Sequence, residues 1–156
     1  MRKYPWIIMT LLLIISLCAC HKNIQSADLS HITFDGVSIG DRFDQVERSR
    51  YTVKSNVSDA YTYNYEEWRL SVEDGIITEI MASFGQICIS VNGSENCRSI
   101  DDITKILGEN HDWSWYDREQ GLRQLQYVDE ENGLQCSFAY AGNSKELVWV
   151  IVRGGR

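Results

Sequence analysis

The side chains in this chain that are best suited to acid–base chemistry are His111 and the carboxylate next to it, Asp112. A histidine oriented by a carboxylate acts as a general base when a nucleophile lies beside it. The sequence places no nucleophile next to this pair, so we expect a solvated loop histidine beside a loop aspartate. A hydrolase built around His111 is the weaker alternative.

Three cysteines lie beyond the leading segment: Cys88, Cys97 and Cys136. Cys88 and Cys97 flank a turn at residues 92–93, and a bridge between them is the favoured pairing in an oxidising compartment. Cys97–Cys136 is the competing pairing, and buried unpaired thiols are the alternative to both. The odd number leaves at least one thiol unpaired in every case.

Aromatic side chains gather in a polar segment, where Trp113, Trp115 and Tyr116 follow one another closely. Trp and Tyr often anchor protein interfaces, so these three are candidate partner contacts. In a small domain the same residue types also cap the core, and exposed rings also stack on sugars. A second stripe of aromatic residues leaves these alternatives open too: Tyr61, Tyr63 and Tyr65.

Composition argues against several classes of function. A net charge of -7 and a pI near 4.9 leave no basic surface to neutralise nucleic-acid phosphates. There is no Cys-x-x-Cys pair, acidic calcium loop or Gly-rich phosphate loop, and the histidines are scattered, so we expect no metal and no cofactor. A non-catalytic protein is therefore favoured over an enzyme.

The first residues have the pattern of an export signal. Arg2 and Lys3 precede an apolar run from Ile7 to Leu17, which has the length of a signal-peptide core and is short for a membrane-spanning helix. The run ends in Leu-Cys-Ala-Cys at residues 17–20, which resembles the lipobox of bacterial lipoproteins. The resemblance implies removal of residues 1–19 and lipidation of Cys20, with a diacylglycerol and an N-linked acyl chain such as palmitate. An ordinary cleaved signal or an uncleaved anchor is the alternative.

This signal predicts a lipid-anchored domain on the cell membrane or the outer membrane, facing the periplasm or the cell exterior. His21, rather than Asp, follows the cysteine, so the usual inner-membrane retention cue of Gram-negative lipoproteins is absent. Without the two basic residues of the leader, 13 basic and 22 acidic residues remain, a net charge of -9 that favours a basic partner face. Residues 20–30 are typical of a polar tether, and 31–156 of a single domain.

That domain shows one pattern twice, in halves of about 31–86 and 87–156. The sequences Ile-Thr-Phe-Asp-Gly at 32–36 and Ile-Ser-Val-Asn-Gly at 89–93 both alternate and end in a turn dipeptide. Alternation followed by Asp-Gly or Asn-Gly indicates a strand that enters a tight turn. We therefore expect each half to begin with a short strand.

Helical spacing follows each of these strands, over 41–49 in the first half and 100–107 in the second. Ser99 is a suitable N-cap for the second helix, and Gly108 ends it. An α+β fold is predicted, with short helices packed on an antiparallel sheet. Strands are expected after each helix, over 61–65, 68–72, 76–83, 125–127, 134–140 and 147–152.

Tandem helix-plus-sheet units on an exported bacterial protein resemble the β-lactamase inhibitor protein fold and the related SmpA/OmlA small lipoproteins. In the first half Arg48-Ser49 replaces the Leu-Gly helix exit typical of those lipoproteins. The resemblance implies protein binding through a concave sheet, without catalysis. It rests on the two helix entries, Ile39-Gly40-Asp41 with Val46 and Ser99-Ile100-Asp101 with Ile106-Leu107-Gly108.

Three functions follow, in order of preference. The first is a non-catalytic, lipid-anchored envelope lipoprotein that binds another protein through Trp113, Trp115 and Tyr116. The second is an envelope-assembly or integrity lipoprotein whose loss weakens the cell surface. The third is an envelope hydrolase centred on His111.

Overall fold

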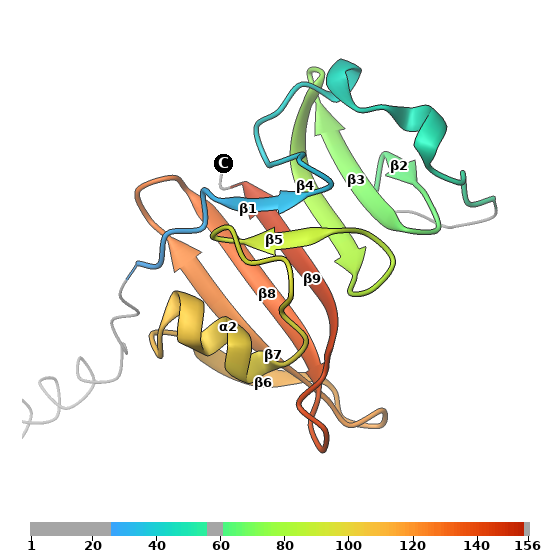
Figure 1. The fold of residues 1–156 in the computed structure, drawn as a ribbon. Coiled ribbons are helices and arrows are strands. Elements are labelled where there is room, and N and C mark those ends of the chain that lie inside the picture. Colours follow the sequence, from blue (N-terminus) through green and yellow to red (C-terminus); the bar gives the residue numbers. More distant parts are fainter. Residues whose placement is uncertain (1–25, 56–60, 155–156) are drawn as a thin grey trace, which may run out of the picture.

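The computed structural model describes residues 26–55 and 61–154, which form nine β-strands in two antiparallel sheets and one α-helix (Figure 1). The main sheet has seven strands in the order β2-β3-β4-β9-β8-β7-β6, and β1 pairs with β5 in a second, two-stranded sheet. The strands of the main sheet are β2 (Tyr63–Asn64), β3 (Trp68–Glu73), β4 (Ile76–Ser83), β6 (Asp112–Asp117), β7 (Leu122–Asp129), β8 (Leu134–Ala141) and β9 (Leu147–Gly154).

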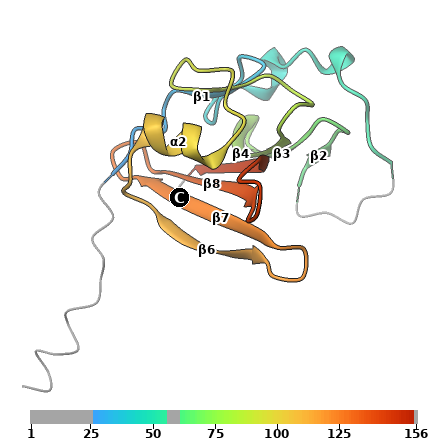
Figure 2. The ribbon, with the colours of Figure 1, turned by 60° about the horizontal axis from the view of Figure 1, so that its bottom comes forward.

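Two elements cover one face of the main sheet: the helix α2 (Ile100–Leu107) and the pair of β1 (Ile32–Phe34) with β5 (Ile89–Val91) (Figures 1 and 2). The core lies between these layers, and its largest fully buried side chains include Trp68, Tyr127 and Phe138. No helix among the residues that the structure describes is long and apolar enough to cross a membrane.

The predicted α+β fold with tandem helices is wrong, because the described chain is β-rich and only one of the two expected α-helices forms. α2 forms as its sequence predicts. The Ser99 hydroxyl accepts a hydrogen bond from the Asp102 N–H (3.3 Å), and Asp102 Oδ2 accepts one from the Ser99 N–H (3.1 Å). This capping box satisfies backbone donors at the start of the helix, and Gly108 ends it at φ 84°.

The first expected helix, over 41–49, is replaced by two 3₁₀ turns, η1 (Phe43–Gln45) and η2 (Arg48–Arg50). Its backbone groups are already used by the sheet. The Phe43 N–H donates to the Gly75 carbonyl, and the Ile77 N–H donates to the Asp41 carbonyl, both at 2.9 Å. An α-helix starting at residue 41 would need the Asp41 carbonyl for its own i+4 hydrogen bond, so the bond from Ile77 competes with that helix. The helix-plus-sheet repeat behind the resemblance is therefore not formed in the first half.

The strand predictions are largely confirmed. β1 and β5 occur where the two alternating sequences place them, and they pair with each other. Asp35 and Gly36 have φ values of 48° and 83°, as the central residues of a type I′ turn require. The apolar β9 lies between β4 and β8, in the middle of the main sheet. The two proposed halves meet along this β4–β9 pairing.

The N-terminal part of the described chain packs onto the domain instead of extending as a tether through residue 30. Leu29 and Ala27 are buried, with exposed fractions of 1% and 8%. The Ala27 N–H donates to the Val128 carbonyl of β7 at 2.9 Å. Ser26 Oγ accepts a hydrogen bond from the Glu130 N–H, also at 2.9 Å. Residues 26–30, which the sequence assigned to the tether, thus belong to the packed structure, and residues 20–25 of that prediction lie outside the described residues.

Candidate functional site

The largest exposed aromatic group in the described chain lies on β6, the last strand of the main sheet. Four large hydrophobic side chains are exposed in the described chain: Val53 at 73%, Trp113 at 60%, Tyr116 at 42% and Trp115 at 37%. Three of them belong to β6. The sequence showed these three in a polar segment with no assigned element, and the structure places them on an edge strand.

The pairing of β6 with β7 sets the face on which each side chain lies. Trp113 is opposite Leu125, and Trp115 is opposite Arg123. Since cross-strand partners share a face, both tryptophans lie on the side of the sheet that carries the core. Their period-two spacing was the signal in the sequence that could have predicted this strand.

These tryptophans are exposed because the layer above the sheet ends before it reaches β6. Tyr127 Oη, on β7, donates to the Gly108 carbonyl at the end of α2, with an O···O distance of 3.0 Å. This bond holds the end of α2 over β7, and β6 extends beyond it (Figure 2). Trp113 therefore does not cap the core.

Two arginines stack on the tryptophan rings. The Arg123 guanidinium lies 5.0 Å from the Trp115 ring centre and 5.9 Å from that of Trp113. Arg118 lies 5.8 Å from the Trp115 ring centre. Each such contact contributes about 0.5–1 kcal/mol at an exposed site. Both rings stay exposed beside these arginines.

The turn between β6 and β7 brings Arg118 to this stack. Asp117 Oδ1 accepts hydrogen bonds from the N–H groups of Glu119 (2.9 Å) and Gln120 (3.0 Å). Gly121 closes the turn at φ 68°, with its N–H donating to the Arg118 carbonyl at 3.2 Å. A carboxylate that binds its own following backbone is typical of a tight turn.

Tyr116 lies on the opposite face from the two tryptophans. A bulge between Trp115 and Asp117 interrupts the β6–β7 register. The Tyr116 ring contacts Trp149 of β9 edge to face, with ring centres 4.8 Å apart. Trp149 is opposite Ala139 on the face of the main sheet that α2 does not cover. The three candidate contacts therefore surround the edge of the sheet and do not form one flat patch.

β6 pairs with β7 along one edge, and no described strand pairs with its other edge. The surrounding segment, residues 109–123, carries four carboxylates and two arginines, a net charge of -2. Together these features define the candidate site, which we call the β6 edge: residues 112–117 with Arg118 and Arg123.

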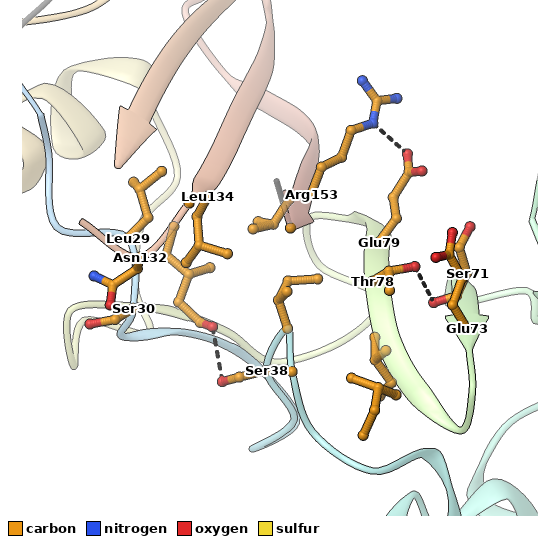
Figure 3. A pocket seen from close by; sticks show the side chains of 18 residues that line it. Leu29, Ser30, Ser38, Ser71, Glu73, Thr78, Glu79, Asn132, Leu134 and Arg153 are labelled. Carbon is orange, nitrogen blue, oxygen red and sulfur yellow. Dashed lines mark hydrogen bonds and ion pairs between the residues drawn. The ribbon is translucent and has the colours of Figure 1, made fainter. Parts of the chain in front are cut away.

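A cavity of about 790 Å³ lies elsewhere, between the β1 region and the ends of β4 and β9 (Figure 3). Its polar side chains bond to the protein itself. Arg153 Nε donates to Glu79 Oε1 at 2.8 Å, and Thr78 Oγ1 donates to the Ser71 carbonyl at 3.4 Å. Polar groups already bonded in this way do not converge on a ligand.

This cavity is also lined by Ser38, the central residue of a Gly-Val-Ser-Ile-Gly segment at 36–40. The Gly-x-Ser-x-Gly spacing presents a serine nucleophile when it connects a strand to a helix. Here Ser38 Oγ donates to the Ile32 carbonyl at 3.2 Å instead of to a histidine, and a 3₁₀ turn follows. The segment is therefore not arranged as a nucleophile elbow.

His111 lies just before β6. Its ring packs edge-on against Tyr127, with ring centres 5.4 Å apart, and its Nε2 is 3.6 Å from the exposed carboxylate of Glu109. These contacts are those of a ring at the margin of the core. Within residues 26–55 and 61–154, no group of three or more His, Cys, Asp or Glu residues has the geometry of a metal site.

The other residues singled out from the sequence are separated from the β6 edge. Cys88, Cys97 and Cys136 are free thiols in the structure, so the Cys88–Cys97 bridge is not formed in it. The tyrosine stripe does not share one face: Tyr65 is buried, whereas Tyr61 Oη donates to Glu79 Oε1 at 3.0 Å on the opposite side of the sheet. Burial and that carboxylate raise the pKa of Tyr61 to about 12.

Comparison with known proteins gives no family model, no curated protein and no solved structure that matches this chain. The β6 edge and the pattern of the first twenty residues are therefore the features that bear on function.

Proposed function

We propose that this protein is an exported, lipid-anchored, non-catalytic protein of a bacterial cell envelope that binds another protein along the β6 edge. The observation that carries the proposal is the pair of exposed, ordered tryptophans, Trp113 and Trp115, on a strand with an unpaired edge. Aromatic side chains that are fixed before binding lose little conformational entropy when a partner covers them.

Lipid anchoring is supported by the first twenty residues. A charged start, a short apolar core and a small residue before Cys20 are the features that a lipoprotein signal combines. The place in the sequence where the described fold starts is consistent with this signal, because packed structure is present from Ser26 onward, after the predicted leader and Cys20. A diacylglycerol and an N-acyl chain would hold the protein on a membrane, since each buried methylene contributes about 0.8 kcal/mol.

Photo-crosslinking in cells tests the binding surface. A crosslinking amino acid at Trp113 of the anchored protein should give one dominant protein adduct. Val53 is the matched control, because it is an exposed apolar residue outside the β6 edge. Equal adducts at Val53 and Trp113, or none at Trp113 in folded protein, would contradict the proposal.

Lipidation is tested separately with Cys20→Ala. The variant should keep its full-length leader and lose the mass of the lipid, and both changes are read by mass spectrometry. Cys18→Ala is the matched control, since Cys18 is two residues away and is preceded by the bulky Leu17 in place of a small residue. Retention of the lipid by Cys20→Ala would refute the anchor.

A further inference from the structure

We infer that the partner binds by adding an extended, basic segment to β6 as an eighth strand of the main sheet. This inference rests on the proposed function and specifies the chemistry of the partner. It requires an open backbone edge, side chains that border that edge, and a charge that favours one occupant over others.

The backbone supplies the first requirement. In an antiparallel pair, alternate residues point their N–H and C=O groups toward the neighbouring strand, and the others point away from it. β6 has a neighbour on one side, so its outward-pointing groups have no strand partner within the described chain. Main-chain hydrogen bonds to such groups give affinity that is independent of the partner's side chains.

The side chains supply the second requirement. Trp113 and Trp115 are two residues apart on one face, so their Cα atoms are about 7 Å apart along the strand. An added strand presents its own alternate side chains with the same spacing. Two side chains of the segment would therefore contact the two rings, and the Arg123 stack holds those rings in place.

The bulge after Trp115 limits where the segment pairs. Bulges bend a strand and interrupt its ladder, so regular pairing would run from Asp112 to Trp115. Beyond it, Tyr116 turns to the other face and contacts Trp149. A short segment of about four residues is enough to fill this edge.

Charge favours a basic segment over a second copy of this chain. Four carboxylates and two arginines surround the edge, and the two arginines are engaged by tryptophan rings. Lys or Arg side chains on the partner would meet two carboxylates at the start of the strand: Asp112, the first residue of β6, and Glu109, three residues before it. A second copy would bring the same net negative charge to both sides of the contact.

The test uses the mature lipidated protein in detergent micelles and two synthetic peptides of the same length, acetylated and amidated: alternating Lys-Val and alternating Glu-Val. Amide hydrogen exchange is followed by NMR for residues 112–117. The Lys-Val peptide should slow alternate amides, those that point outward, by about tenfold at about ten times its Kd, because exchange then occurs only from the free fraction. Trp113→Ala should weaken the binding of this peptide, and Val53→Ala should leave its binding unchanged.

Each of the following three outcomes would overturn the inference. Equal protection by the Glu-Val peptide would exclude charge selection, and binding without amide protection would show docking through side chains alone. Protection in the absence of peptide that depends on protein concentration would identify a second copy as the occupant. If Trp113 still crosslinks one protein in cells in any of these cases, the proposed function stands and only the strand-addition mode fails.

Discussion

The backbone N–H of Leu29 donates a 2.8 Å hydrogen bond to Asp129 Oδ2, although 100 residues of chain separate the two. The same carboxylate, 1% exposed, accepts bonds from the Asn132 N–H at 3.0 Å and the Asn132 side-chain amide at 2.8 Å. One aspartate therefore organises the β7–β8 turn and also fixes the entry of the chain into the domain.

Asp129→Ala should destabilise the domain by at least about 1–3 kcal/mol, because buried donors on Leu29 and Asn132 lose their acceptor. Urea unfolding followed by circular dichroism measures this change. Glu130→Ala, one residue away and exposed, should change the free energy of unfolding by less than about 0.5 kcal/mol. Similar values for the two variants would show that the carboxylate does not hold the segment.

The contribution of Asp129 should depend on pH. Burial raises the pKa of Asp129, but hydrogen bonds from Leu29 and Asn132 outweigh it and hold that pKa below the ordinary 3.8. The ionised form is thus favoured in the folded state. Its stabilisation is complete above the unfolded pKa and is lost as the pH falls through the folded pKa.

Unfolding curves for the unsubstituted protein and Asp129→Asn, measured from pH 6 down to pH 2, check this sign. The difference in unfolding free energy should be constant near pH 6 and should shrink below about pH 4. A difference that grew on acidification would mean that the folded-state pKa is raised.

Arg123→Ala should free the Trp113 and Trp115 rings and lower the free energy of unfolding by about 1–2 kcal/mol, because two ring contacts are lost. Time-resolved fluorescence anisotropy of the tryptophans should show faster local motion. Arg123→Lys should have an intermediate effect, because it keeps the charge and loses the planar stack. Arg69→Ala is the control, since Arg69 lies on β3, away from β6. Unchanged anisotropy in Arg123→Ala would argue that the stack does not order the rings.

Oxidation should join Cys88 to Cys97. The hairpin at Asn92-Gly93 is closed by a bridge between Val91 and Ser94, and the same register three residues further would set the cysteines opposite each other. Both line one cavity of about 480 Å³. Closing this short loop should stabilise the fold by about 2–3 kcal/mol.

Peptide mapping of the full chain with Cys18→Ser and Cys20→Ser, equilibrated in a glutathione buffer, checks the pairing. Glutathione disulfide would accept the two electrons as both thiols lose their protons. Cys136 should react with an alkylating agent only after unfolding, because it is buried and burial raises the pKa of its thiol. A Cys97–Cys136 peptide, or three free thiols, would contradict the expected bridge.

Local patterns predicted much of the fold because local physics determines those parts. The alternating segments before Asp35-Gly36 and Asn92-Gly93 form strands and turns where expected, and Ser99 caps α2. The helix expected over 41–49 failed because its backbone is bonded to residues near 75 and 77, a long-range pairing that helical spacing does not reveal.

The candidate site was predicted by residue type but not by geometry. Trp113, Trp115 and Tyr116 were selected as aromatic residues in a polar segment, and they are exposed. That they belong to a strand depends on pairing with β7, and that they remain uncovered depends on where α2 ends. The opposite placement of Tyr116 follows from the alternation of side chains along β6, one residue after Trp115. The bulge before Asp117 is what no pattern in the sequence indicated.

If Cys20 carries a lipid, the attachment of Ser26 to the β7–β8 turn limits how far the domain can move from the membrane. Six peptide units connect Cys20 to Ser26, so their Cα atoms are at most about 20 Å apart. With a lipid on Cys20, the protein would search for its partner within a thin layer along the membrane surface. A partner attached to the same membrane would be met repeatedly in two dimensions, so a short and individually weak strand contact would be enough to keep the two proteins together.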